Sequence, residues 1–141
     1  MRILVVHSRY TLRGGEDAVV DAEVAALRER GHHVHLHEVY NAEPSGAREQ
    51  LAAARASIWS TTQAHELSRV LRAQQPDVAH VHNHAWALSP AIYPAIASAG
   101  VPIVCTLHNY RLTCANAYLL RDGAPCETCV GSRASWAGIR H

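Results

Sequence analysis

The sequence predicts a doubly wound α/β domain built on a parallel sheet of about four strands. Two continuous apolar runs, residues 3–6 and 103–107, are typical of parallel strands that are buried on both faces. Between them, stretches with the apolar spacing of amphipathic helices alternate with two further strand-like runs. The order strand, helix, strand, two helices, strand, helix, strand requires right-handed crossovers, which place helices on both faces of the sheet.

The first helix is expected to begin at about Glu16. Val20, Val24 and Leu27 keep the i, i+4, i+7 spacing of a stripe that faces the core. Carboxylates in the first turn and arginines in the last turn both favour the helix dipole. Gly31 is placed for a left-handed C-cap, so the helix should end there.

The middle of the chain is expected to contain an edge strand and two helices. Residues 33–39 alternate between apolar and histidine side chains, as a half-exposed strand does. Residues 47–56 favour a helix, although Leu51 is their one large apolar anchor. Ser60 and Gln63 fit a capping box. The helix that follows has an apolar face formed by Leu67, Val70 and Leu71.

A third strand is expected over residues 78–82, followed by a helix. Ser89 and Pro90 are the favoured N-cap and first-turn pair for that helix, which should end at Gly100. Pro94 falls inside it, so we expect a late start or a kink. The last strand, 103–107, is expected to be central and buried.

The totals restrict the class of protein. A chain of 141 residues suits a single domain, here taken as 1–141. A formal net charge of +1 argues against nucleic acid as the main partner. All the basic residues are arginine and alanine is abundant, which we interpret as genomic codon bias in a bacterial protein. No apolar run approaches the roughly 20 residues of a membrane span, so we expect a cytoplasmic protein, free or peripheral at the inner face of the membrane.

Gly14 and Gly15 form the first candidate site. They separate the first strand from the first helix, where glycines let the backbone approach a ligand and the helix N-terminus offers N–H groups to a phosphate. Glu16 and Asp17 weaken a simple anion site, and a plain turn is an equal alternative. The spacing is not G-x-G-x-x-G, so a nicotinamide-dependent oxidoreductase is disfavoured.

A run of alternating histidines ends the third strand. Alternation places His80 and His82 on the same face, followed by Asn83. An H-x-H pair can supply two metal ligands, but no carboxylate lies nearby in the sequence. Imidazoles that line a pocket are the favoured interpretation, and for His80 a hydrogen-bonded core histidine is the alternative.

The apolar run of the last strand stops at His108, Asn109, Tyr110 and Arg111. In open α/β sheets ligands bind just outside the carboxyl ends of the strands. A buried strand would hold His108 on a rigid scaffold, and Asn109 and Arg111 add hydrogen-bond donors that suit sugar hydroxyls or phosphate. We therefore expect these side chains in the site.

Three cysteines follow in a loop at the C-terminal end of the domain. Cys114, Cys126 and Cys129 have the spacing C-x11-C-x2-C, whose second half is typical of a structural zinc site. In the cytoplasm metal binding is favoured over disulfides, and free thiols are the alternative. Cys105 is expected inside the buried strand, outside the site. Open candidates for the fourth ligand are His108, His141 and a group outside this chain.

Four segments together resemble a known family. They are Gly-Gly-Glu-Asp at 14–17, Asp-Val-Ala-His-Val-His-Asn at 77–83, Thr-Leu-His-Asn-Tyr-Arg-Leu at 106–112, and the cysteine segment that ends at Cys129. The combination resembles the N-terminal domain of glycosyltransferase family 4. The resemblance implies a Rossmann-like domain that forms one half of a GT-B fold, and it runs from residue 1 to about 131.

The resemblance also implies roles. Gly14, Gly15 and Glu16 would lie near the donor phosphates, His82 and Asn83 would border the acceptor, and His108 would contact the donor sugar as the catalytic histidine. The partners would be a nucleotide-sugar donor and a saccharide or lipid-linked acceptor. Such enzymes retain the anomeric configuration and need no catalytic metal, so any zinc would be structural.

The family's second domain binds the nucleotide-sugar, and no segment here corresponds to it. We therefore expect an N-terminal fragment that is inactive without the C-terminal GT-B domain. The rival from another class is a non-catalytic, zinc-stabilised module that binds a partner or a small ligand.

Overall fold

The computed structural model describes residues 1–41, 44–114 and 116–129. The chain divides into two compact units, Met1–Thr106 and Leu107–His141. That division concerns compactness alone, and the single folding domain expected over residues 1–141 stays a prediction.

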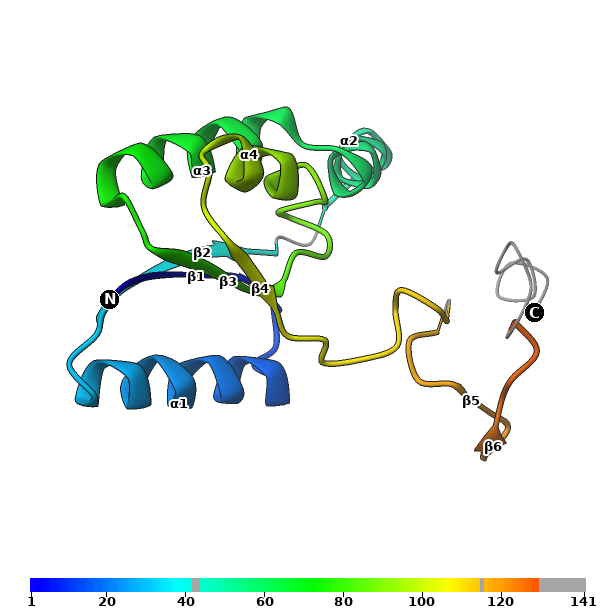
Figure 1. Ribbon diagram of the computed structural model, residues 1–141. Coiled ribbons are helices and arrows are strands. Elements are labelled where there is room, and N and C mark those ends of the chain that lie inside the picture. Colours follow the sequence, from blue (N-terminus) through cyan, green and yellow to red (C-terminus); the bar gives the residue numbers. More distant parts are fainter. Residues whose placement is uncertain (42–43, 115, 130–141) are drawn as a thin grey trace. The chain divides into compact units, whose positions relative to one another are not determined.

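The first unit is built on a four-stranded parallel sheet, as the sequence predicts. Its strands are β1 (Arg2–Arg9), β2 (His33–Tyr40), β3 (Val78–Asn83) and β4 (Ile103–Cys105), in the order β2-β1-β3-β4 (Figure 1). β2 is the first strand in that order, so the predicted edge position is confirmed. The register of β1 against β3 shifts between Val6 and His7, so that His7 pairs with Asn83.

Helices cover both faces of this sheet. Helix α1 (Gly15–Glu29) lies on one face, and α2 (Ala47–Ile58), α3 (Thr61–Gln74) and α4 (Ile92–Ser98) lie on the other (Figure 1). This confirms the doubly wound α/β fold. Within the described residues, no helix combines the length and the apolar character that crossing a membrane requires.

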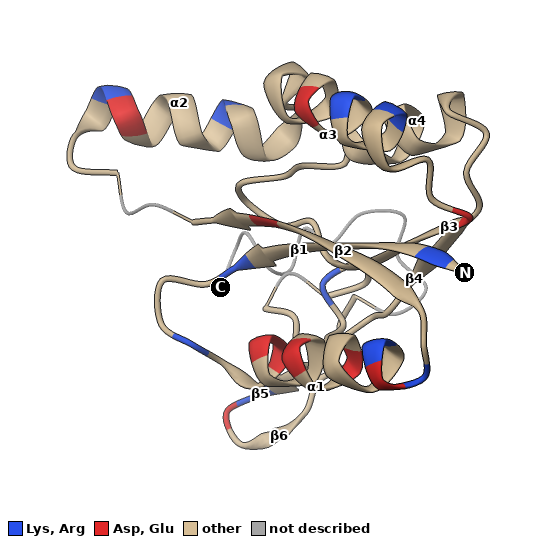
Figure 2. Ribbon diagram, turned by 90° about the vertical axis from the view of Figure 1, so that its left-hand side faces the viewer, with Lys and Arg blue, Asp and Glu red and all other residues tan. Residues whose placement is uncertain are grey.

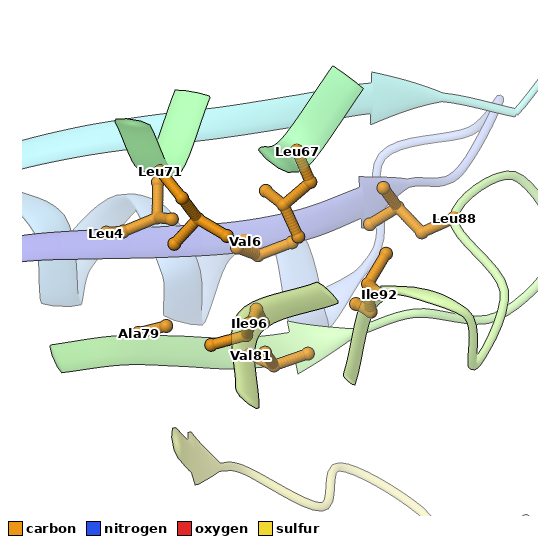
Figure 3. Close-up of a cluster of buried hydrophobic side chains, with 9 residues drawn as sticks. All are labelled: Leu4, Val6, Leu67, Leu71, Ala79, Val81, Leu88, Ile92 and Ile96. Atoms are coloured by element: carbon orange, nitrogen blue, oxygen red, sulfur yellow. The ribbon is translucent and has the colours of Figure 1, made fainter. Parts of the chain in front are cut away.

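Side chains of β1 alternate between two hydrophobic cores, one on each face of the sheet. The core under α3 and α4 is shown in Figure 3 and contains Leu4, Val6, Leu67, Leu71, Ala79, Val81, Leu88, Ile92 and Ile96. The core under α1 contains Ile3, Val5, Val20 and Val24. Because β1 is buried on both faces, its sequence is a continuous apolar run.

Helix α1 follows the predicted pattern closely. Val20 and Val24 are buried and Leu27 packs against them. Gly31, with φ of +81°, adopts the left-handed conformation after the C-cap residue Arg30. Five of the six charged residues of α1 are acidic, and Figure 2 shows them along the helix. Because its charge is mainly negative, the exposed side of α1 would repel a polyanionic partner such as a nucleic acid.

Helices α2 and α3 form where expected, but the contacts that hold them differ from those predicted. Leu51 does not anchor α2: it is 65% exposed, and α2 buries no side chain. At the start of α3, the Ser60 hydroxyl accepts a hydrogen bond from the Gln63 backbone N–H at 3.3 Å, so half of the predicted capping box forms. The other half is replaced, because the Ser60 N–H donates to the Ser89 hydroxyl at 2.9 Å.

The predicted start of α4 is wrong. Ser89 has φ of +63°, and the helix begins three residues later at Ile92. The Ser89 hydroxyl accepts instead from the backbone N–H groups of Ser60 and Ala91, so a tertiary contact replaces the local cap. Pro94 is the third residue of α4, a position whose N–H has no partner within the helix, and it interrupts no hydrogen bond there. The expected late start is confirmed.

The prediction of a central, buried last strand is also wrong. β4 is three residues long and is the last strand in the sheet order, and Ile103, Val104 and Cys105 are all exposed. A short apolar run shows that a segment favours a strand, but it does not specify which elements pack over it. Within the described residues no element covers β4 as α1 and α3 cover β1.

The second unit contains a short antiparallel hairpin. β5 (Leu120–Arg121) pairs with β6 (Ala124–Pro125). The two residues between them, Asp122 and Gly123, have φ of +51° and +77°. Two consecutive positive φ values are what the commonest two-residue hairpin turn requires, and Asp-Gly is a favoured sequence for it.

Candidate functional site

The carboxyl ends of β1 and β3 meet at the centre of the sheet. β1 continues into α1 on one face, and β3 is reached from α3 on the other face. From β1 the chain first adds β2 on one side and then adds β3 and β4 on the other, so the strand order reverses between β1 and β3. Open α/β sheets bind ligands at such a switch point. The polar residues at this edge are therefore the candidates for a binding site.

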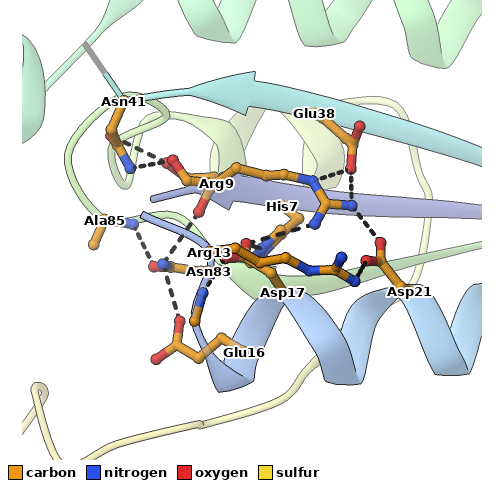
Figure 4. A network of polar contacts seen from close by, with 12 residues as sticks. His7, Arg9, Arg13, Glu16, Asp17, Asp21, Glu38, Asn41, Asn83 and Ala85 are labelled. Atoms are coloured by element: carbon orange, nitrogen blue, oxygen red, sulfur yellow. Dashed lines mark hydrogen bonds and ion pairs between the residues drawn. The ribbon is translucent and has the colours of Figure 1, made fainter. Parts of the chain in front are cut away.

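Glu16 and Asn83 come together there although they are 67 positions apart in the chain. The Asn83 side-chain amide donates to the Glu16 carboxylate at 3.2 Å, and the Ala85 backbone N–H donates to Asn83 Oδ1 at 2.9 Å (Figure 4). Asn83 is 8% exposed and Glu16 is partly buried. The structure thus joins two of the predicted site residues at the switch point of the sheet.

The glycine loop is held by the helix that it precedes. The Gly14 N–H donates to Asp17 Oδ2 at 2.8 Å, and Asp17 Oδ1 lies 2.8 Å from His7 Nε2. Since its own helix occupies the Gly14 N–H, this group is not open to a phosphate. Gly15 is exposed, and a Cβ added there would meet no atom within 4 Å. Of the two glycines, Gly15 is therefore the one whose backbone a ligand can approach.

Charged groups around Asp17 form a network at the same edge (Figure 4). Burial opposes ionisation of Asp17, but hydrogen bonds from Gly14 and His7 outweigh it and lower the pKa of this carboxyl. Burial likewise opposes the charge of Arg9, yet hydrogen bonds to Asp21 and Glu38 raise its pKa further. These shifts favour the charged forms of Asp17 and Arg9, which lie 3.6 Å apart and have opposite charges.

Two hollows open beside this network, and both are lined by Asn41. The first, about 510 Å³, is lined by charged and hydroxyl-bearing residues that include Arg9 and Arg13. The second, about 500 Å³, is mostly apolar and lies between α2 and Trp86. The Asn41 side chain joins the loops around both, donating to the Arg9 carbonyl at 2.8 Å and accepting from the Ala87 N–H at 3.0 Å. Asn41 was not among the predicted site residues. It directly follows the edge strand β2, and a polar residue at the carboxyl end of a strand is a candidate for the site.

His82 is more deeply buried than we expect of a pocket-lining residue, and its place beside the acceptor stays a prediction. Its side chain is fully buried on the face that α1 covers, beside His80. Glu23 of α1 lies against both rings, 2.6 Å from His80 Nδ1 and 3.6 Å from His82 Nε2. The sequence interpretation gave these histidines no carboxylate partner, and the structure supplies one from another element.

His108, Asn109 and Arg111 belong to the second unit, and β4 ends at Cys105, before the boundary between the units. The Asn109 side chain accepts from the Arg111 backbone N–H at 3.0 Å, which makes a local turn. His108 is half-buried. The expectation that a rigid buried strand holds His108 is therefore wrong, and its role as a site residue stays a prediction.

The cysteine thiols have separate partners. Cys114 Sγ donates to Asn116 Oδ1 at 2.8 Å, and Cys126 Sγ lies 3.3 Å from the Thr128 hydroxyl. That hydrogen bond lowers the pKa of the Cys126 thiol. Across the described residues, one group brings three potential metal ligands together, and it is Glu23, His80 and His82. Zinc binding by Cys114, Cys126 and Cys129 stays a prediction, and His141 lies outside the described residues.

Comparison with known proteins gives one match. Residues 13–126 match the profile of the family described as Glycosyltransferase Family 4. No curated protein and no solved structure matches the chain. The profile covers most of the 141 residues, including the glycine loop, the segment that contains Asn83 and the segment that contains His108. The parallel four-stranded sheet with helices on both faces is the Rossmann-like half of a GT-B fold, and the chain belongs to glycosyltransferase family 4.

Proposed function

We propose that this chain is the acceptor-side domain of a retaining glycosyltransferase. The enzyme would transfer a sugar from a nucleotide-diphosphate sugar to a saccharide or a lipid-linked acceptor. The family match over residues 13–126 is the observation that carries this proposal. In the reaction the anomeric carbon would exchange its bond to the diphosphate oxygen for one to the acceptor oxygen, releasing the nucleoside diphosphate and a proton.

The glycine loop is proposed to face the donor diphosphate. Because Asp17 holds the Gly14 N–H, the amide groups of the first turn at Gly15 and Glu16 are the ones we assign to this contact. Backbone N–H groups at a helix N-terminus stabilise negative charge on a leaving diphosphate. Asn83, bonded to Glu16, would contact the acceptor hydroxyls from the same edge.

The two hollows that share Asn41 support the acceptor assignment. The hollow beside Arg9 offers the exposed guanidinium of Arg13 and tyrosine side chains to a saccharide or phosphate. The apolar one, beside Trp86, suits a hydrocarbon chain. Together they fit an amphipathic acceptor better than a free sugar.

The experiment that tests the proposed function is a sugar-transfer assay on the purified 141-residue chain, alone and supplied with a GT-B donor-binding domain. We expect no turnover of any nucleotide-sugar by the chain alone and measurable transfer by the two domains together. Sugar transfer by the chain alone would contradict the proposal that this domain binds the acceptor and a second domain binds the donor. Zinc-dependent binding of a partner without transfer in either case would favour the non-catalytic module.

Gly15→Ala tests the donor contact. The added methyl group meets open space, and alanine favours a helical position by up to about 1 kcal/mol, so stability should be unchanged or slightly higher. In the two-domain enzyme we expect kcat/KM to fall about tenfold, because the methyl group occupies the approach to the Gly15 amide. Melting temperature and steady-state kinetics measure the two effects. Unchanged kinetics would remove Gly15 from the site; Gly46→Ala, at the start of α2, is the matched control.

We propose that Cys114, Cys126 and Cys129 hold a structural zinc ion, and that no metal is needed for the chemistry. Three thiolates leave one tetrahedral position to another ligand, so the ion should be lost readily to chelators. Cobalt substitution should give a sulfur-to-metal charge-transfer band that disappears in the double variant Cys126→Ser/Cys129→Ser. Cys105→Ser is the control and should keep the band. No band in the parent chain would refute zinc binding.

A further inference from the structure

The sequence and the fold place two histidines and one carboxylate at a single point under α1. In β3, alternate residues face opposite sides of the sheet, and Val78 packs in the core under α1. His80 and His82 follow on that same face. Glu23 is three residues after the buried Val20, so the helix turns its side chain toward the sheet.

The donor atoms of these three side chains are close enough for one ion. They lie within 4.8 Å of one another, and the rings of His80 and His82 are 4.2 Å apart between centroids. Ligands bound to one tetrahedral zinc ion at 2.0–2.2 Å are separated by about 3.4 Å. The distances from Glu23 to His80 Nδ1 (2.6 Å) and to His82 Nε2 (3.6 Å) lie on either side of that value.

The outer contact of His80 fits a ligand role. Its Nε2 lies 2.8 Å from the hydroxyl of Thr106, on the opposite side of the ring from Glu23. If Nδ1 binds an ion, Nε2 carries the proton and can donate it to the Thr106 hydroxyl. Such a hydrogen bond fixes the tautomer and orientation of metal-binding histidines.

The charge of the cluster is compatible with a bound cation. The carboxylate of Glu23 faces both rings, whose centroids are 4.2 Å apart, and a divalent cation would compensate its negative charge. Glu23 is 31% exposed and His80 15% exposed, so an ion can reach the cluster from the Glu23 side, although His82 is fully buried.

We propose that Glu23, His80 and His82 form a binding site for a divalent transition-metal ion of the zinc type, separate from the cysteine segment. Two imidazole nitrogens and one carboxylate oxygen form a donor set that suits Zn²⁺ and its neighbours and not Mg²⁺ or Ca²⁺. The ion would tie α1 to β3. It would therefore fix the helix whose first turn carries Gly15, without taking part in sugar transfer.

The test uses the full chain with Cys114, Cys126 and Cys129 replaced by serine, so that thiolates of that segment cannot bind the probe. Zn²⁺ alone is titrated by calorimetry. We expect one ion per chain, and we expect Glu23→Gln in the same background to weaken binding at least about tenfold. Glu29→Gln, which changes an exposed carboxylate on the same helix, should bind as the parent does. No zinc binding by the parent, or equal binding by the Glu23→Gln variant, would overturn the proposal.

A second measurement uses the parent chain alone, so its result does not depend on whether variants of the three metal-binding residues fold. Ring-nitrogen NMR signals of His80 and His82 in the parent chain should both shift on addition of one equivalent of Zn²⁺. Signals that shift only at other histidines, such as the exposed His65, would place the ion elsewhere and refute the site. Because neither readout uses sugar transfer, failure of this site is distinguishable from failure of the proposed function.

Discussion

Replacing His108 with alanine is expected to lower kcat/KM about a hundredfold in the two-domain enzyme, which is about 2.7 kcal/mol of transition-state stabilisation. The imidazole is proposed to hydrogen-bond the donor sugar and orient it for attack with retention, and alanine offers no replacement for that contact. Steady-state kinetics measure the effect. The melting temperature should change little, because His108 is half-buried in a short turn segment.

The alternative role for His108 is structural, and the same variant separates the two. A histidine that only holds the turn would leave the activity of folded protein near normal and would lower the melting temperature clearly. His65→Ala, on the exposed face of α3, is the matched control and should affect neither quantity. A clear loss of stability with normal kcat/KM would remove His108 from the catalytic site.

Replacing Asp17 with alanine should lower the free energy of unfolding by about 3 kcal/mol. Asp17 is fully buried and accepts from both the Gly14 N–H and His7 Nε2 at 2.8 Å. Alanine would leave the buried His7 Nε2 and the half-buried Gly14 N–H without this acceptor, and it would also remove a negative charge near Arg9. Denaturant unfolding measures the loss. Glu29→Ala, on the exposed side of α1, should change stability by less than about 0.5 kcal/mol.

Asp17 also makes a testable contribution to the pH dependence of stability. Its pKa in the folded protein is lower than the ordinary value of 3.8, so its stabilising effect is present above pH 3.8 and is lost as the pH falls through the lower folded value. Asp17→Asn should therefore flatten the stability curve below pH 3.8. If the parent and this variant lose stability in parallel over that range, Asp17 is not the group that titrates.

The elements that the sequence predicts correctly are those whose pattern repeats over many residues. α1 buries side chains at helical spacing and β1 buries a continuous apolar run, and each pattern indicates that burial directly. The start of α4 could not be predicted, because Ser89 makes a tertiary contact with Ser60 that overrides its local preference as an N-cap. β4 has the composition of a buried strand, but what covers a strand depends on elements that its own residues do not specify.

The same distinction applies to the candidate site. Glu16 and Asn83 each follow a predicted strand, so the parallel topology alone brings them to one edge. Glu23 was missed because a charged residue beside an apolar stripe normally belongs to a solvated face. Only the packing of α1 on β3 shows that it faces two histidines.

The exposed last strand has a consequence for how this protein behaves at high concentration. β4 presents apolar side chains and an outer backbone edge, which together act as a template for strand addition by another chain. Pro102 limits that template on one side, since it has no N–H to contribute and immediately precedes the strand. Cys105 lies at the other end and is an exposed free thiol. Under oxidising conditions, a disulfide bond between the Cys105 thiols of two chains would make such an association covalent. A reducing agent should therefore limit aggregation of the protein, in addition to keeping the thiols of the cysteine segment reduced.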